Sequence, residues 1–195
     1  MQIQCRRSCF RQFPRPELVF KRWLVLLERT LPTPDPSFSP SPRPAPVTAR
    51  WLATWFGAGH SPVAPGTVGA IASLPLHIAL RTLGPIPHAT VTLLLTAAGV
   101  WASGRVAEAS GEEDPQSIVI DEVVGTLLAL GIAGPGGLAA QVLAFVAFRV
   151  LDVKKPWIID DVQRLEPAGL GIMADDVLAG IGAGLLGRAF GRLLR

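Results

Sequence analysis

The chain has 195 residues, which is enough for one domain with a substantial core and an additional segment. Ala, Leu, Val and Gly dominate its apolar half and Tyr is absent, so a β-rich fold is disfavoured and an all-α, compact multihelical domain is expected. Only 17% of the residues are charged and the mean hydropathy is +0.40, values that favour a membrane-associated protein or a largely buried helical bundle.

Charge and proline content separate the first 50 residues from the rest. Residues 1–50 hold nine Lys/Arg, three Asp/Glu and nine of the 18 prolines, whereas residues 51–195 hold nine Lys/Arg and twelve Asp/Glu. We predict a basic, Pro-rich, disordered tail over 1–49, with a linker at 31–48, followed by a single folded domain over 50–195. Because the basic excess lies in the tail, the body carries no stripe of the kind that binds nucleic acid.

Two features of the tail suggest a function only weakly. Residues 17–29 form a possible short amphipathic helix that could lie on a membrane. Lys21 and Arg22 interrupt its apolar stretch and no small-residue cleavage site follows, which argues against a secretory signal. The run from Cys9 to Arg15 has the C-x5-R spacing of a cysteine-dependent phosphatase loop. Its Pro14 lacks the N–H group that such a loop uses to bind phosphate, and we discount this match.

The body contains four apolar segments, at about 68–83, 89–104, 123–148 and 177–194. None is expected to be a clean membrane-spanning helix, because a span needs roughly 20 continuous apolar residues. Pro75 interrupts the first segment, and the sequence GPGG at 134–137 divides the third into two helices. Each half of the third segment fits a buried core helix or a shallowly inserted one.

Small residues recur every four positions in the last apolar segment, which predicts a smooth helix face that packs tightly against another helix. These residues are Ala179, Gly180, Ala183, Gly184, Gly187 and Gly191. The same segment ends in a basic stripe of Arg188, Arg192 and Arg195. The stripe suits the C-terminal end of a helix, and it fits a solvated face and contact with phosphate headgroups equally well.

Carboxylates border the apolar helices of the body, in a part of the chain that is otherwise poor in charge. They are Asp114, Asp121, Glu122, Asp152, Asp175 and Asp176. Their partner could be Mg²⁺, which prefers oxygen ligands, or it could be the cations Arg149, Lys154 and Lys155. A third interpretation is that acidic residues at helix starts simply cap the helix and offset its macrodipole.

Four sequence blocks resemble the phosphatidylglycerophosphatase A family, in the order found in that family. They are WFGAGHSPVAPGTVGAIASLP at 55–75, DPQSIVIDEVVG at 114–125, FRVLDVKKPW at 148–157 and AGLGIMADDVLAG at 168–180. Departures from the family pattern occur at Ala70, Ile158 and Ala168, and none of them removes an acidic residue. The first 50 residues have no counterpart in the resemblance.

The resemblance implies a Mg²⁺-dependent phosphatase that converts phosphatidylglycerophosphate to phosphatidylglycerol and inorganic phosphate. It implies a place at the cytoplasmic side of the bacterial inner membrane, contact with the membrane surface or bilayer, and a possible homo-oligomer. Mg²⁺ would be held by Asp121, Glu122, Asp152, Asp175 and Asp176. Catalysis would use Asp121, Glu122, Asp152, Arg149 and Lys155, and the substrate phosphate would contact Thr67, Arg149 and Lys155.

Other interpretations remain open at this point. Thr67 could equally cap a helix, and Lys154 lies where the family varies. His60 is expected to be a surface or capping residue rather than a general acid, and His77 and His88 are no better candidates for that role. Alternative functions are a phosphatase of another phosphorylated membrane lipid, and a non-enzymatic helical scaffold or transporter subunit whose acids form caps and ion pairs.

Overall fold

The computed structural model describes residues 44–154 and 165–194. All of these residues belong to the second of two units into which the chain divides, Pro42–Arg195. Residues 1–43 of the predicted tail, Lys155 and Arg195 lie outside the described residues.

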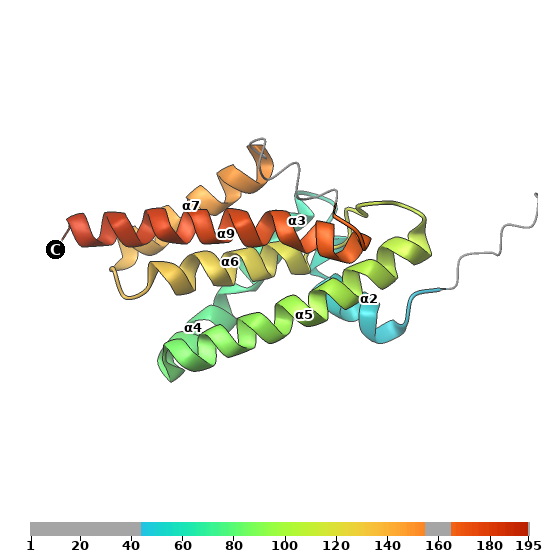
Figure 1. Cartoon of the computed structure of the whole chain (residues 1–195), viewed down its shortest axis with the longest axis horizontal. Helices are drawn as coiled ribbons and strands as arrows, with labels where there is room; N and C mark the ends of the chain where they lie inside the picture. Colours follow the sequence, from blue (N-terminus) through green and yellow to red (C-terminus); the bar gives the residue numbers. More distant parts are fainter. Residues whose placement is uncertain (1–43, 155–164, 195) are drawn as a thin grey trace, which may run out of the picture. The chain divides into compact units, whose positions relative to one another are not determined.

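The described residues form helices joined by turns, with no strand among them, which confirms the all-α prediction. The helices are labelled in Figure 1 in chain order. They are α2 (Val47–Ala53), α3 (Pro65–Ala72), α4 (Leu74–Leu83), α5 (Pro85–Ser110), α6 (Ile120–Ala133), α7 (Leu138–Lys154) and α9 (Ala168–Leu193), with a 3-10 turn, η1, at Ala58–His60.

Two helices begin earlier than expected. Helix α2 starts at Val47, inside the predicted linker, because Ala49 and Ala53 pack fully buried in the core. Helix α9 starts at Ala168, nine residues before the apolar segment expected at 177–194. Its first turns are polar in part but closely packed, since a Cβ on Gly169 would collide with the backbone of α5.

Glycine and proline end the helices where the sequence predicts. Gly134 and Gly137 have positive φ angles of 66° and 89° in the turn between α6 and α7, which confirms that the third apolar segment forms two helices. Pro75 lies in the first turn of α4, directly after the break from α3, and Pro85 is the first residue of α5.

Helices α5 and α9 are longer than the apolar segments at 89–104 and 177–194, neither of which was expected to be a clean membrane-spanning helix. Each has 26 residues and is apolar enough to cross a bilayer by length and composition. At about 1.5 Å per residue, such a helix exceeds the ~30 Å thickness of a bilayer's hydrocarbon core. Helix α9 is packed among α5, α6 and α7, so part of its apolar character serves the interior of the protein.

Helices α6 and α9 pack in parallel through their small residues. A Cβ on Gly180 would come within 2.5 Å of the Gly125 carbonyl oxygen, and one turn later a Cβ on Gly184 would come within 2.9 Å of the Ala129 oxygen. The backbones are therefore in close contact, which confirms the smooth packing face predicted for the last segment. One turn before Gly180, the close packing of the two helices places Asp176 of α9 next to the first turn of α6.

Gly180→Ala should destabilise the protein, whereas Gly182→Ala should not. The first substitution forces a methyl group into the α6 backbone and should cost about 1–3 kcal/mol of unfolding free energy. A Cβ on Gly182 would meet only the Leu151 side chain, at 3.6 Å, so the higher helix propensity of Ala should leave stability equal or raised by about 1 kcal/mol. Unfolding by a denaturing detergent would compare the two variants, and equal destabilisation would contradict the packing described.

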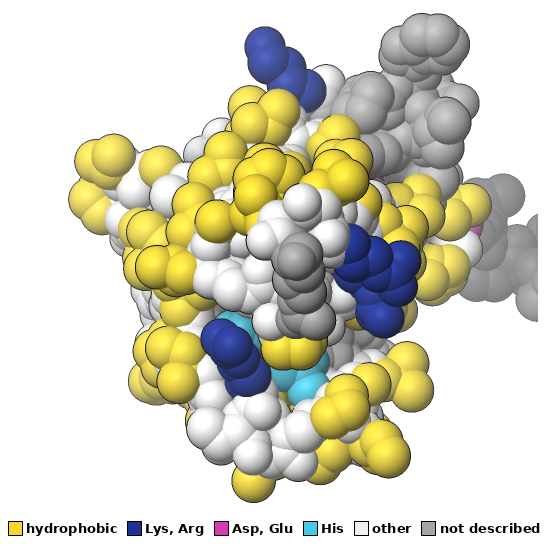
Figure 2. All heavy atoms as spheres, turned by 90° about the vertical axis from the view of Figure 1, so that its left-hand side faces the viewer, with side chains coloured by type: hydrophobic (Ala, Val, Ile, Leu, Met, Phe, Trp, Pro, Cys, Tyr) yellow, Lys and Arg dark blue, Asp and Glu magenta, His cyan; other side chains and the backbone are white. Residues whose placement is uncertain are grey.

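The surface carries many exposed apolar side chains. On α7 they fall on one outward stripe, formed by Leu138, Val142, Val146, Val150 and Val153. Figure 2 shows one end of the molecule, where apolar side chains surround a hollow that contains histidine, with Lys or Arg side chains beside it. Apolar surface of this extent is uncommon on a monomeric soluble protein and marks an interaction surface.

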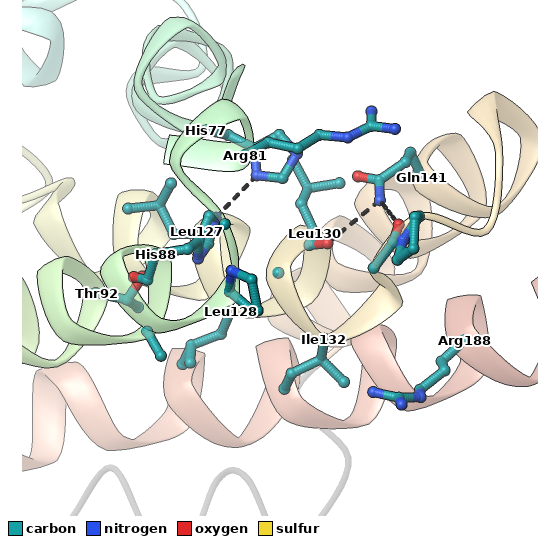
Figure 3. Close-up of a pocket in the computed structure, with 16 residues that line it drawn as sticks. His77, Arg81, His88, Thr92, Leu127, Leu128, Leu130, Ile132, Gln141 and Arg188 are labelled. Carbon is teal, nitrogen blue, oxygen red and sulfur yellow. Dashed lines mark hydrogen bonds between the residues drawn. The ribbon is translucent and has the colours of Figure 1, made fainter. Parts of the chain in front are cut away.

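That hollow is a cavity of about 550 Å³ between α4, α5, α6, α7 and α9. Inside it, His77 of α4 and His88 of α5 are buried and hydrogen bonded, with 3.0 Å between His77 Nδ1 and His88 Nε2 (Figure 3). His88 fits because Gly131 of α6 has no side chain, since a Cβ there would lie 2.7 Å from the imidazole ring. The two histidines are therefore buried partners, although the sequence identified neither as part of a pair.

Candidate active site

The first turn of α6 carries the first two carboxylates of the site. Asp121 and Glu122 follow Ile120, and the apolar residues Val123 and Val124 after them are completely buried. The hydrophobic helix thus anchors two acids at its N-terminus, where the macrodipole favours negative charge. The Asp121 Oδ1 atom accepts a hydrogen bond from the Glu122 backbone N–H at 3.0 Å.

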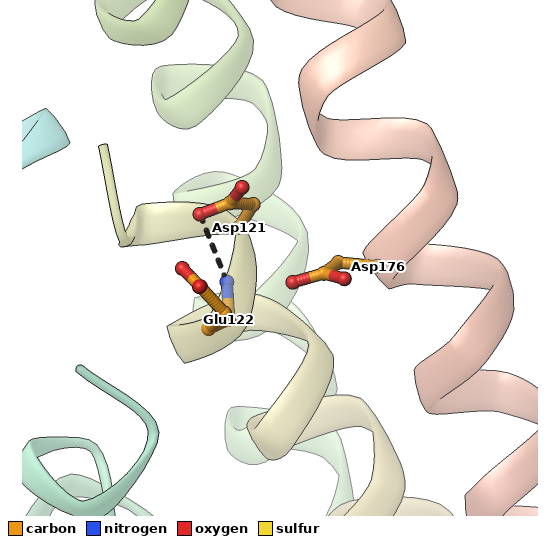
Figure 4. A group of neighbouring side chains, drawn as sticks. All are labelled: Asp121, Glu122 and Asp176. Carbon is orange, nitrogen blue, oxygen red and sulfur yellow. Dashed lines mark hydrogen bonds between the residues drawn. The ribbon is translucent and has the colours of Figure 1, made fainter. Parts of the chain in front are cut away.

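The third carboxylate, Asp176, comes from α9. Figure 4 shows Asp176 projecting from α9 toward Asp121 and Glu122 on α6, and one ligand oxygen of each residue lies within 4.8 Å of the others. Asp176 is only 3% exposed and lies eight residues after the start of its helix. The capping interpretation is therefore wrong for Asp175 and Asp176, because a capping residue must lie at the helix terminus.

The three carboxylates form an electrostatically unfavourable group in the protein alone. Burial, followed by the neighbouring charges of Glu122 and Asp176, raises the pKa of Asp121 well above its usual value. Burial also raises the pKa of Glu122, although the positive charge of Arg149 opposes this effect. The Glu122 Oε2 and Asp176 Oδ2 atoms are buried without a hydrogen-bond partner among the described residues. Such a group calls for an additional positive charge.

Arg149, near the C-terminal end of α7, links the acids to a different part of the chain. Its guanidinium forms a hydrogen-bonded ion pair with Asp152 and lies 4.0 Å from Glu122 Oε1. Its Nη2 also donates a hydrogen bond of 3.2 Å to Thr67 Oγ1 on α3. The Arg149 side chain is only 18% exposed, so burial and three partners hold the cation in place beside the carboxylates.

The start of α3 contributes uncharged groups to the site. Ala64 precedes the helix with a positive φ of 47°, and Gly66 is packed so closely that a Cβ there would collide with the Glu122 carboxylate. Thr67 makes no capping hydrogen bond and its hydroxyl accepts from Arg149, so the capping interpretation of Thr67 is also wrong. The PGT sequence therefore brings a hydroxyl and a helix N-terminus against the acids.

The structure thus brings most of the predicted site residues together around the first turn of α6. Asp121, Glu122 and Asp176 form the close group, and Asp152, Arg149 and Thr67 adjoin it. Asp175 is buried beside Asp176 but lies outside the close group, and Lys155 lies outside the described residues.

Asp114 also acts on the site, although the sequence did not identify it as a site residue. Its negative charge adds to the effects that raise the pKa of Asp121, and it begins the same sequence block.

Comparison with known proteins gives a consistent result. A family model described as "Phosphatidylglycerophosphatase A" matches residues 51–190. The phosphatidylglycerophosphatase A of Escherichia coli is 40% identical over 139 residues, which cover 69% of this chain and 79% of that protein. The Haemophilus influenzae protein of the same name is 35% identical over 131 residues, covering 67% of this chain and 80% of its own length.

A Bacteroides thetaiotaomicron protein, provisionally named a phosphatidylinositol-3-phosphatase, is also similar. It is 38% identical over 138 residues, which cover 67% of this chain and 85% of that protein. No solved structure matches the chain. The matched region begins in α2 and ends in α9, so it includes every described residue of the candidate site.

Proposed function

The chain belongs to the phosphatidylglycerophosphatase A family and is a phosphoric monoester hydrolase, and we propose that it hydrolyses phosphatidylglycerophosphate to phosphatidylglycerol and inorganic phosphate with Mg²⁺. Family membership sets aside the non-enzymatic scaffold considered from the sequence. The observation that supports the mechanism is the group of Asp121, Glu122 and Asp176 beside the Arg149 guanidinium.

The residues present fit Mg²⁺. Three carboxylates offer oxygen ligands within 4.8 Å of one another, and two of them have buried oxygens without a hydrogen-bond partner among the described residues. Hard oxygen ligands of this kind suit Mg²⁺, which commonly retains several waters and contacts substrate phosphate. We therefore assign Asp121, Glu122 and Asp176 as the residues that hold the ion, with Asp152 and Asp175 next to them.

Hydrolysis forms a bond from phosphorus to the oxygen of water and breaks the bond from phosphorus to the glycerol oxygen. A proton lost from water ends on the departing glycerol hydroxyl. Uncatalysed hydrolysis of phosphate monoesters is so slow that the site must lower the barrier by roughly 20 kcal/mol or more. When bound, Mg²⁺ would supply positive charge against the phosphate oxygens and would lower the pKa of a nearby water.

The protein's own groups position the substrate and neutralise its charge. Arg149 is held by Asp152 and Thr67, so its guanidinium is fixed before the phosphate binds. A planar guanidinium can bind two phosphate oxygens at once and stabilise the negative charge that develops on them. The Thr67 hydroxyl, at the start of α3, can donate to the same phosphate group once Arg149 engages it.

A membrane location suits both the substrate and the surface of the protein. The lipid remains in the bilayer, so the enzyme has to reach its headgroup there. Helices α5 and α9 are long and apolar enough to enter the membrane, and the outward stripe on α7 adds exposed apolar surface. We place the active site on the cytoplasmic side of the bacterial inner membrane.

The substrate can be tested directly. Purified full-length protein in nonionic detergent should release phosphate from phosphatidylglycerophosphate only with Mg²⁺, and faster than from phosphatidylinositol 3-phosphate. The second lipid is the specific alternative, because the name of the Bacteroides relative points to it. A preference for the phosphoinositide would replace the proposed substrate, and release unaffected by a metal chelator would reject the Mg²⁺ mechanism.

Lys155→Ala should reduce activity more than Lys154→Ala. Lys155 occupies the family position before Pro156, whereas Lys154 is exposed at the end of α7. Losing a cation that stabilises phosphate charge should cost about 2–4 kcal/mol of the activation barrier, while an exposed lysine should contribute less than about 1 kcal/mol. Initial rates of phosphate release at saturating Mg²⁺ measure the difference, and equal losses would remove Lys155 from the proposed site.

A further inference from the structure

The cavity that contains His77 and His88 lies at the opposite end of α6 from the carboxylate group. Its lining includes Gly131 and Ile132 in the last turn of α6, whereas Glu122 lies in the first turn. With about 1.5 Å of rise per residue, the two ends are roughly 15 Å apart along this helix. The cavity is therefore separate from the proposed phosphatase site.

Arginines on two helices give the cavity a positive charge. Arg81 of α4 and Arg188 of α9 both line it (Figure 3). Arg192 follows Arg188 one turn later, beside a smaller adjoining hollow. Neither Arg81 nor Arg188 forms an ion pair within 44–154 and 165–194, where the salt bridges involve Arg105 and Arg149. The chain segments that form this end, 77–96, 126–148 and 180–194, contain no Asp or Glu.

This charge argues against a metal ion at the histidine pair. Two histidines can ligate a transition metal, but the cavity lining offers no cysteine or carboxylate as a further ligand. Burial, followed by the neighbouring His88 and the positive Arg81, lowers the pKa of His77 to about 4, in keeping with a lining that holds two arginines and no carboxylate. A negatively charged group is the better complement to this cavity.

The cavity also offers a buried polar atom and an apolar wall. His77 is 6% exposed, and its Nε2 makes no hydrogen bond of ordinary geometry among the described residues, although the Gln141 side chain lies close enough to interact with the imidazole. Leu127, Leu128 and Ile132 line the cavity on the α6 side. A ligand that satisfies these surfaces together has an anionic head and an apolar body.

We propose that this cavity binds an acidic phospholipid, with its anionic headgroup at the arginines that line the cavity, Arg81 and Arg188, and its first acyl carbons against the leucines and isoleucine of α6. The guanidinium groups provide the donors that phosphate oxygens prefer. The exposed apolar side chains around the opening allow the acyl chains to continue into the bilayer (Figure 2). The site would attach the protein to acidic lipid independently of the phosphatase reaction.

Calorimetric titration of the full chain in nonionic detergent with dioctanoylphosphatidylglycerol tests this site. The variant carrying both Arg81→Gln and Arg188→Gln should bind this lipid at least about tenfold more weakly than the wild type, because two charge-assisted contacts are lost. Both arginines are exposed, so the substitutions should leave the helices folded, as circular dichroism would verify. Arg105→Gln, a matched substitution of an exposed arginine elsewhere on α5, should leave the affinity within about twofold.

Further measurements separate this site from other sources of binding. Arg149→Gln should keep the lipid affinity if binding occurs away from the phosphatase site. Dioctanoylphosphatidylcholine, which has no net charge, and inorganic phosphate, which has no apolar body, should each bind at least about tenfold more weakly. Unchanged binding in the double arginine variant, loss of binding in Arg149→Gln, or equally tight binding of either control ligand would overturn the proposal.

Discussion

Asp176→Asn should reduce Mg²⁺-dependent phosphate release by about a thousandfold, equivalent to about 4 kcal/mol, while the protein stays folded. Asn preserves the size of the side chain but removes a charged oxygen ligand from the group with Asp121 and Glu122. Because it also removes the buried member of three mutually repelling carboxylates, the unfolding free energy in the absence of metal should stay equal or rise. Phosphate release at increasing Mg²⁺ concentrations, with circular dichroism on the same samples, measures both effects.

Matched acidic residues provide the comparison. Asp175→Asn changes the adjacent buried residue, which lies outside the close group, and should cost less activity than Asp176→Asn. Glu108→Gln changes an exposed acid on α5 and should have little effect. A folded Asp176→Asn protein with wild-type turnover and Mg²⁺ dependence would rule out the assignment of this residue to the metal.

Arg149→Lys should lower the rate of phosphate release by about a hundredfold or more, although the positive charge is kept. A lysine cannot reach Asp152, Thr67 and a phosphate group with the fixed planar geometry of a guanidinium. The loss should appear mainly in kcat, because the charge developing in the transition state is what the guanidinium stabilises.

Arg105→Lys is the matched control for this substitution. Arg105 pairs with Glu108 on the exposed surface of α5, so its replacement by Lys should leave kcat within about twofold. If Arg149→Lys were as active as Arg105→Lys, the fixed guanidinium would have no special part in the reaction.

The helical fold could be predicted from the sequence because its turns depend on local chemistry. The Gly134–Gly137 turn and the proline that begins α5 mark helix ends without any knowledge of distant residues. The start of α9 could not be predicted in this way. Its first turns are fixed by contact between Gly169 and the backbone of α5, far away in the sequence.

The site was only partly predictable for the same reason. The acids and Arg149 were found because they are rare charges between apolar helices, but their spacing did not show which three carboxylates meet. That choice depends on the contact of Gly125 with Gly180, which sets Asp176 against the first turn of α6. The pairing of His77 with His88 likewise depends on the space left by Gly131.

The most direct test of the metal assignment is a binding measurement that does not depend on turnover. Mn²⁺ accepts the same oxygen ligands as Mg²⁺, and its free concentration can be followed by electron paramagnetic resonance. The wild-type protein should bind Mn²⁺, Mg²⁺ should displace it, and the variant with Asp121→Asn and Asp176→Asn should bind at least about tenfold more weakly. Equal Mn²⁺ affinity in the wild type and in this folded variant would contradict the proposed metal site.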